Sequence, residues 1–183
     1  MSKAKYLIWH ISDSEFGEVS LIRSWHKEKG WNDIGYHGII LNGFVTAKDF
    51  RLNRRIDFLN GSFQIGRVFD ADAFIENQEI GAHAYGFNSE SIGLCLIGKD
   101  GNFTPYQIET ALKVSLEFMR MFEISLDNVI GHYELGRFKP EFATDKKCPE
   151  IDMSHIRDIL KLEDNIKREI SKRFVEWGMR GKK

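Results

Sequence analysis

Residues 6–11 read YLIWHI, and the polar residues Ser12-Asp13-Ser14 follow them directly. A short apolar run that ends in small polar residues is typical of a buried β-strand that leads into a loop. We therefore predict a strand over residues 6–11, with His10 near its carboxyl end. Functional side chains are often built at strand ends and in the loops after them, so His10 is the first candidate for such a role.

Two further apolar segments predict strands beside the first one. Residues 92–97 (IGLCLI) form a continuous apolar run that suits the centre of a sheet. Residues 35–41 (GYHGIIL) predict a strand whose alternation places Tyr36 and Ile40 on one face and His37 on the other. These segments indicate a sheet with a largely apolar interior.

The chain between these segments is more polar. Residues 42–55 are polar and in places basic, and we interpret them as an insertion. The dipeptide Asn60-Gly61 lies between residues 57–59 and 62–65, and this arrangement predicts a β-hairpin with a two-residue turn.

Three helices are predicted from their start and stop signals. Ser20 can cap a helix that ends at Gly30. The run Thr104-Pro105-Tyr106-Gln107 offers an N-cap, a proline in the first turn and a capping-box glutamine. A long charged helix is expected from Ser154 toward the C-terminus. Strands mixed with helices favour an α/β or α+β layer fold built on one sheet.

Length and composition limit the class of protein. The 183 residues suit a single domain, which we place at 1–153 with 154–183 as a helical tail of the same unit. The net charge is −1, so bulk charge gives no reason to expect nucleic acid as a partner. No segment approaches the roughly 18 apolar residues of a membrane span. The N-terminal apolar run is also too short for a signal peptide, so we expect cytoplasmic synthesis.

Scattered histidines and cysteines are the remaining chemical signal, because the P-loop, G-x-G-x-x-G, C-x-x-C and H-E-x-x-H motifs are absent. His10 ends a strand, His132 follows a glycine at another strand end, and Cys148 lies in a polar loop. These three are the best candidates for metal ligands. The pattern by itself is weak, since unconnected histidines and cysteines are far commoner than zinc sites.

Other residues of the same types have plainer interpretations. His26 is flanked by Lys27 and Glu28 and is expected on the surface. His37 is expected to be a core histidine with a hydrogen-bond partner. Cys95 lies between two leucines and is expected to behave as a small buried apolar residue.

Several short motifs together resemble one known family. They are Trp25-His26, Gly30 to His37 (GWNDIGYH), Ile65-Gly66-Arg67, Gly81 to Gly93 (GAHAYGFNSESIG), Gly131 to Leu135 (GHYEL) and Lys146 to Pro149 (KKCP). In this order and at these intervals, over about residues 5–153, they resemble the type-2 N-acetylmuramoyl-L-alanine amidases. That family includes phage lytic amidases and animal peptidoglycan-recognition proteins.

The resemblance implies a central mixed β-sheet flanked by helices. It implies a Zn²⁺ ion held by His10, His132 and Cys148, with Tyr36 and Lys146 as donors to the oxyanion and with His83 and Asn88 in contact with the substrate. It further implies cleavage of the amide between the lactyl group of N-acetylmuramic acid and the L-alanine of the stem peptide.

The chain departs from parts of this family. A related branch of recycling amidases has an aspartate as third ligand and a glutamate on the central strand, where this chain has Cys148 and Cys95. The chain is therefore more similar to the lytic and recognition branch. Residues 42–55 and 70–79 are longer than the corresponding segments are expected to be, which leaves the contacts with the stem peptide open.

These features leave three functional hypotheses. The main one is a zinc amidase from a phage or prophage, expected to be monomeric, that acts on the cell wall after release by another protein such as a holin. The second is a peptidoglycan-binding module without catalysis, although such members commonly lack the cysteine ligand. The third is a cysteine hydrolase with Cys148 as nucleophile and His132 as base.

The C-terminal segment carries a local positive charge. Residues 167–183 contain seven basic and two acidic residues, a net charge of +5, which leaves −6 for residues 1–166. The segment could be a solvated helix end, or a basic amphipathic tail that contacts anionic envelope. Because Ile170, Phe174 and Trp177 have helical spacing, we also expect partial packing of this segment on the domain.

Overall fold

The computed structural model describes residues 1–70, 72–145 and 147–180, with the backbone alone for 174–180. Five strands form the main sheet in the order β4-β3-β6-β2-β7. They are β2 (Tyr6–Ile11), β3 (Gly38–Asn42), β4 (Asn60–Ile65), β6 (Ser91–Leu96) and β7 (Val129–Gly131). A small second sheet pairs β1 (Ser2–Lys3) with β5 (Phe74–Ile75).

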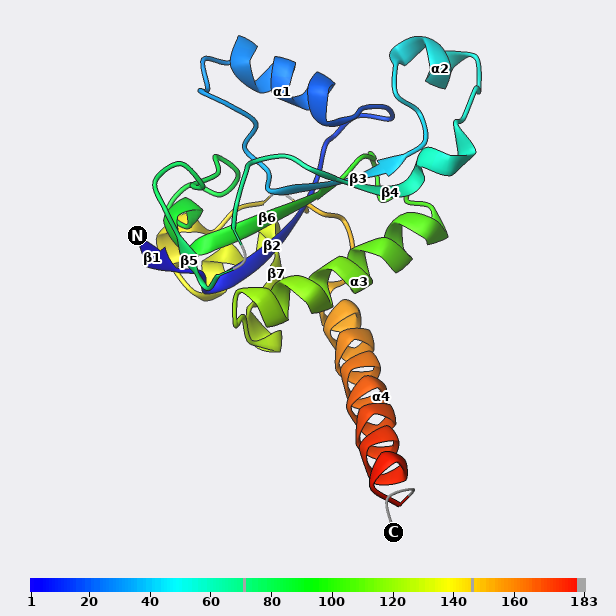
Figure 1. Ribbon diagram of the computed structural model, residues 1–183. Coiled ribbons are helices and arrows are strands. Elements are labelled where there is room, and N and C mark those ends of the chain that lie inside the picture. Colours follow the sequence, from blue (N-terminus) through cyan, green and yellow to red (C-terminus); the bar gives the residue numbers. More distant parts are fainter. Residues whose placement is uncertain (71, 146, 181–183) are drawn as a thin grey trace.

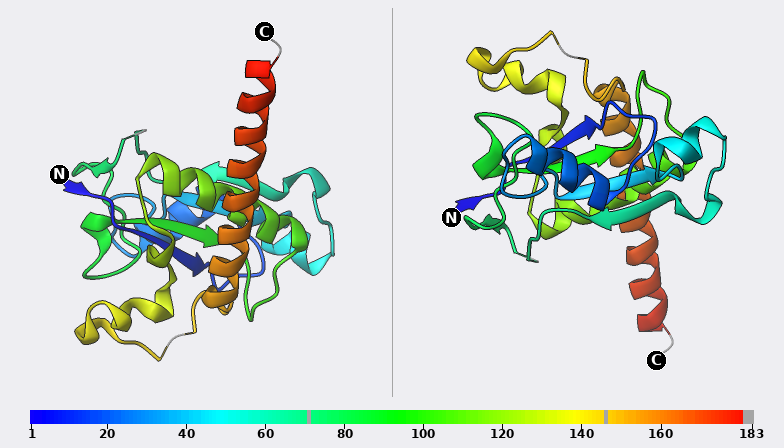
Figure 2. Two further views of the ribbon diagram at one scale, coloured as in Figure 1. Left: turned by 90° about the horizontal axis from the view of Figure 1, so that it is seen from below. Right: turned by 90° about the horizontal axis from the view of Figure 1, so that it is seen from above.

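The main sheet is mixed, as predicted. Strand β2 pairs in parallel with β6 and β7, and β3 pairs in parallel with β6 and antiparallel with β4. The helices are α1 (Val19–Glu28), α2 (Ala47–Arg51), α3 (Pro105–Met121) and α4 (Met153–Arg180). Helices α3 and the start of α4 cover one face of the sheet, and α1 covers the other (Figures 1 and 2).

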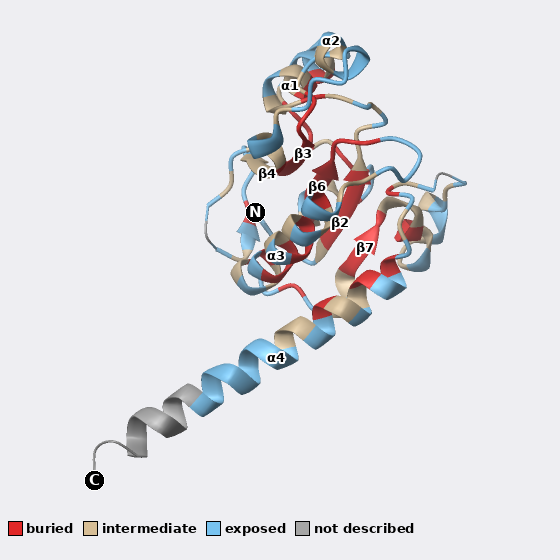
Figure 3. Ribbon diagram, turned by 90° about the vertical axis from the view of Figure 1, so that its right-hand side faces the viewer, coloured by how far each residue is buried: buried red, intermediate tan, exposed pale blue. Residues whose placement is uncertain are grey.

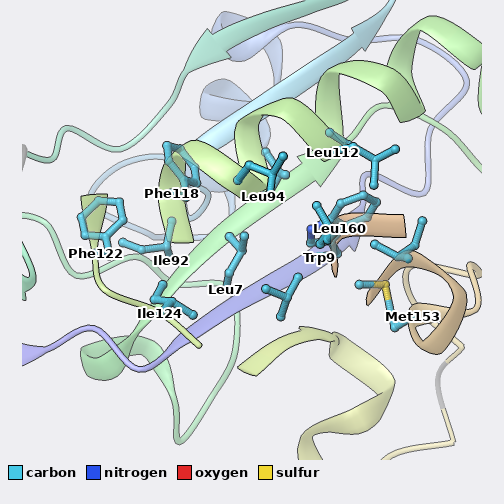
Figure 4. Packing of buried hydrophobic residues seen from close by; sticks show 14 of the residues in the cluster. Leu7, Trp9, Ile92, Leu94, Leu112, Phe118, Phe122, Ile124, Met153 and Leu160 are labelled. Atoms are coloured by element: carbon cyan, nitrogen blue, oxygen red, sulfur yellow. The ribbon is translucent and has the colours of Figure 1, made fainter. Parts of the chain in front are cut away.

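The larger core lies between the sheet and helices α3 and α4 (Figure 4). Leu7 and Trp9 of β2 point into it, because alternate residues of a strand share a face. The Trp9 indole N–H donates to the Ser115 hydroxyl at 3.0 Å, which satisfies the polar atom of the largest buried side chain. His10, one residue later, therefore points to the opposite face, toward α1.

All three predicted helices are present, but two of them begin earlier than predicted, and the prediction that Ser20 caps the first one is wrong. Helix α3 begins after Thr104, and Thr104 and Gln107 form the predicted capping box. Helix α4 begins at Met153, one residue before the predicted start. Helix α1 begins at Val19 with Glu18 as its N-cap, so Ser20 lies inside the helix and donates its hydroxyl to Glu18.

The predicted hairpin at Asn60-Gly61 is wrong. Residues Asp57–Leu59 form a single 3₁₀ turn, and Asn60–Ile65 form one strand that pairs with β3. Gly61 has a positive φ of 81°, and a Cβ there would lie 2.7 Å from Tyr106. Gly61 therefore allows α3 to pack closely against the strand, and it does not form a turn. The segment interpreted as an insertion contributes the end of β3 and the capped helix α2.

The base of α4 is fixed to the strand β7. The Arg157 guanidinium donates to both carboxylate oxygens of Glu134, at 2.8 and 2.9 Å, and to the Val129 carbonyl at 3.0 Å. Glu134 also accepts the Gly131 N–H at 3.0 Å. Burial alone would raise the pKa of Glu134, but the bonds from Arg157 and Gly131 outweigh it and lower that pKa.

Beyond its first turns, α4 leaves the domain (Figure 3). Met153, Ile156 and Leu160 are buried in the core, whereas Ile170 is 50% exposed. The expected packing of Ile170 on the domain is therefore wrong, and the side chains of Phe174 and Trp177 lie outside the described residues. Among the helices described, none has both the length and the apolar content that a membrane span needs.

Two buried histidines support the segment before β3. Tyr36 and His37 precede the strand, so the predicted alternation does not extend to them. His37 accepts the Gly93 N–H at its Nδ1 and donates from Nε2 to the Glu79 carbonyl, both at 2.9 Å, which confirms it as a bonded core histidine.

The prediction that His26 is a surface residue is wrong. It is buried, and its Nδ1 accepts the Gly35 N–H at 2.9 Å. The sequence contained the missed signal, because His26 lies four residues after the buried Ile22 and so shares its helix face. Burial lowers the pKa of both His26 and His37 to about 4.

Stability should consequently fall as the pH drops below 6.5. The unfolded chain takes up protons near pH 6.5, whereas the folded chain keeps both rings neutral until about pH 4. By linkage, each of the two histidines should cost about 2 kcal/mol of unfolding free energy between pH 7 and pH 5. Urea unfolding at a series of pH values measures this loss.

His26→Asn is the matched variant, because the Asn Oδ1 can replace Nδ1 as acceptor for the Gly35 N–H but does not titrate. Its unfolding free energy should fall about 2 kcal/mol less than that of the wild type over the same interval. Parallel curves for the two proteins would contradict the assignment.

Candidate metal centre

Parallel pairing of β2 with β7 brings two of the predicted ligands together. Trp9 is in register with Gly131, so the next residues, His10 and His132, lie side by side with ring centroids 4.8 Å apart. Cys148 comes from a loop that is distant in the sequence. Its backbone carbonyl accepts the Tyr133 N–H at 2.9 Å, which holds this loop next to the turn after β7. One ligand atom from each of His10, His132 and Cys148 lies within 4.8 Å of the other two.

The thiol is held against the end of β2. The Ile11 N–H donates to the Cys148 Sγ at 3.4 Å, and this sulfur lies 3.9 Å from the Nδ1 of His10. A backbone N–H directed at sulfur favours the thiolate, the form that binds metals. The structure thus gathers the three side chains that sequence reasoning singled out as ligands.

Hydrogen bonds fix which nitrogen of His10 faces the thiol. The Ser91 hydroxyl lies 3.4 Å from the His83 Nε2, but it gives its one hydrogen to the Phe87 carbonyl at 2.8 Å. The His83 Nε2 therefore receives no hydrogen from Ser91, and as a donor it bonds the Ser91 carbonyl at 3.3 Å. The His83 Nδ1 then accepts from the His10 Nε2 at 3.0 Å. This leaves the Nδ1 of His10 with its lone pair directed toward Cys148.

Burial keeps both of these imidazoles neutral. The pKa of His10 lies well below its usual value, first because of burial and then because of the neighbouring His83 and His132 rings. Burial also lowers the pKa of His83. Neutral imidazole is the form that can donate a lone pair to a metal ion.

The place of His83 depends on a glycine of the central strand. A Cβ on Gly93 would lie 2.6 Å from the His83 ring. Strand β6 therefore has to present a bare backbone here, so that the ring can lie on the sheet next to His10. The side-chain Oδ1 of Asn88 shapes the same loop, because it accepts the backbone N–H groups of His83 and Ala84 at 3.0 and 2.7 Å.

Tyr36 lies beside the same cluster. Its ring centroid is 5.2 Å from that of His10. Burial raises the pKa of Tyr36 well above its usual value, so the hydroxyl stays protonated at neutral pH and can act as a donor. Cys95 is fully buried on β6, as predicted.

A pocket of about 530 Å³ opens over these side chains. Of the predicted site residues, its lining includes Tyr36, His83 and the three candidate ligands, but Asn88 is not among the described residues that line it. Lys146 lies outside the described residues. The lining also includes residues that sequence reasoning did not select, namely Ile11, Ser12, Asp13, Lys29, Trp31, Ala82, Lys147 and Glu150.

Comparison with known proteins places the chain in a family. Residues 3–151 match the family model described as N-acetylmuramoyl-L-alanine amidase. The endolysin of Escherichia phage T7 is 30% identical over 142 residues, which cover 74% of this chain and 71% of the endolysin.

Solved structures show the same fold. The amidase LysCS from Clostridium intestinale URNW superposes with a TM-score of 0.62 at 20% identity, over 87% of this chain and 85% of that one. Drosophila PGRP-LB superposes with a TM-score of 0.53 at 24% identity, over 81% and 76% of the two chains. With its mixed sheet, its cluster of two histidines and a cysteine, and a family match over most of its length, the chain belongs to the N-acetylmuramoyl-L-alanine amidase family.

Proposed function

We propose that this chain is a zinc-dependent endolysin. It hydrolyses the amide between the lactyl group of N-acetylmuramic acid and the L-alanine of the stem peptide. The observation that carries the proposal is the convergence of His10, His132 and Cys148 at the floor of one pocket. The endolysins of phages T7 and K11, at 30% and 32% identity, support a role in lysis.

The donor set fits zinc. Two imidazoles and a thiolate are common zinc ligands, and three protein ligands leave a fourth position for water or substrate. Burial holds His10 neutral, and the Ile11 N–H favours the thiolate of Cys148. When bound, zinc would supply a Lewis acid and lower the pKa of a bound water, as amide hydrolysis requires.

The side chains around the pocket would perform the remaining steps. The protonated Tyr36 hydroxyl donates to the carbonyl oxygen of the scissile amide as that oxygen becomes negative. Lys146, two residues before Cys148, is proposed as a second donor on the strength of the family motif. The pocket is large enough for the lactyl group and the first residues of a stem peptide.

Purified protein should contain about one zinc per chain. Cys148→Ser should lower zinc affinity and activity together, because a serine hydroxyl is a poor ligand at neutral pH. Elemental analysis, with mass spectrometry of digested peptidoglycan, measures both. Activity that resists chelators yet disappears in Cys148→Ser would favour the cysteine hydrolase instead, and wild-type protein that binds zinc without cleaving would favour the binding module.

Tyr36→Phe should retain fold and zinc but lose about a hundredfold in kcat, because it removes a single donor to the oxyanion. The turnover of a soluble muramoyl peptide, with the zinc content measured on the same sample, tests this. If kcat remains near the wild-type value, Tyr36 has only a structural role.

His83 has two proposed roles that can be separated. If it holds His10 in the metal-binding tautomer, His83→Ala should weaken zinc binding by about 10–100-fold. His83→Asn should restore part of this loss, because its Oδ1 can accept from the His10 Nε2. If His83 instead contacts substrate alone, zinc affinity should not change and only KM should rise. Titration against a chromogenic chelator distinguishes the two.

A further inference from the structure

The projecting half of α4 carries an apolar face that no described residue covers. Leu162, Ile166 and Ile170 are 61%, 49% and 50% exposed and follow one another at intervals of four residues. We call these three residues the outer stripe. At this spacing they share one side of the helix, over a length of about 12 Å. Figure 3 shows this part of α4 standing clear of the sheet.

Charged side chains border the outer stripe, and basic ones outnumber acidic ones. Arg173 and Glu169 line the same hollow as Ile166 and Ile170. A second hollow that reaches Ile170 is lined by Lys167 and Arg168 together with Asp164. Arg168 and Arg173 form ion pairs with Asp164 and Glu169, at 2.7 and 2.9 Å.

Two lysines remain for an outside partner. Lys167 and Lys172 make no ion pair with a described residue. Residues 167–183 together carry +5, whereas residues 1–166 carry −6. In the part of this segment whose side chains are described, residues 167–173, four basic residues stand against one acidic residue, so this stretch of the helix is cationic on a protein whose remainder is acidic.

The outer stripe and the lysines beside it together limit the kind of partner that can bind this side of the helix. A second copy in parallel contact would bring two cationic helices together, which is unfavourable. A polar anionic polymer would attract the lysines but would leave three large apolar side chains in water. A bilayer of anionic phospholipid satisfies both features, since apolar side chains can enter the acyl boundary while lysines extend to the head groups.

We propose that the outer stripe docks α4 onto the surface of an anionic phospholipid bilayer, with the helix lying in the interface. The acidic body is repelled by the same surface, so the domain stays in water with its pocket accessible. This docking does not depend on the metal or on peptidoglycan cleavage.

Flotation of full-length protein with lipid vesicles tests the proposal. The wild type should bind vesicles of phosphatidylglycerol mixed with phosphatidylcholine, and should bind pure phosphatidylcholine much more weakly. The double variant Ile166→Ser/Ile170→Ser should lose about tenfold or more in partitioning, because the apolar area is removed. Lys167→Glu/Lys172→Glu should lose a similar amount, and its residual binding should depend less on salt.

Phe58→Ser is the matched control. Phe58 is 84% exposed on the body of the domain, so this variant removes an exposed apolar side chain away from α4 and should bind like the wild type. Circular dichroism and the melting temperature should be the same for all variants, since the altered side chains lie in water.

Three results would overturn the proposal. The first is wild-type protein that does not bind anionic vesicles, and the second is a stripe variant that binds them unchanged. The third is a wild-type dimer in analytical ultracentrifugation that Ile166→Ser/Ile170→Ser converts to monomer, because the occupant would then be a second copy. Zinc content and amidase activity do not enter these measurements, so the proposed function is tested separately.

Discussion

The parallel register between β2 and β7 is the constraint on which the site depends. It aligns Trp9 with Gly131, and in doing so it sets His10 beside His132 at the same edge of the sheet. Successive side chains of β2 point to opposite faces of the sheet, so neighbouring residues have different roles. Trp9 anchors the core under α3, while His10 is directed into the pocket. A slip of one residue would exchange the two faces and remove both the core anchor and the ligand.

Four imidazoles are buried in or near the pocket, and neutral groups partner all of them. His10, His83, His37 and His26 are all buried, and each has a hydrogen-bond partner. Desolvation therefore keeps them uncharged, and each ring acts as a fixed arrangement of one donor and one acceptor. For His83 and His10 these bonds are direct, so the tautomer of one ring sets that of the other, whereas His26 and His37 are held by backbone groups.

Much of this could be predicted from local patterns. Strands β2 and β6 and the capped start of α3 follow from short-range signals, because apolar runs and capping boxes act within a few residues. The three ligands could be nominated from their places at strand ends and in a loop. Their convergence could not be derived from spacing, since Cys148 reaches the site through contacts 138 residues apart in the chain.

The failures have physical causes. Asn60-Gly61 has the composition of a turn. A glycine is needed at position 61, however, because α3 packs too closely for a Cβ, and the local sequence does not reveal this contact. His26 has charged sequence neighbours that point away from it. The composition of the flanking residues therefore predicted an exposed side chain, although His26 is buried. Ile170 has helical spacing, but the helix has left the domain before that residue, so its side chain stays half exposed.

Two hydrogen bonds between Arg157 and Glu134 connect the long helix to the candidate metal site. Arg157 lies in the base of α4, and Glu134 lies in the turn that carries His132. The protruding half of α4 therefore extends from a base that is bonded directly to the turn carrying His132. The paired hydrogen bonds between two planar groups also fix the orientation of the helix base relative to that turn, so the direction in which α4 projects is set at the ligand-bearing turn.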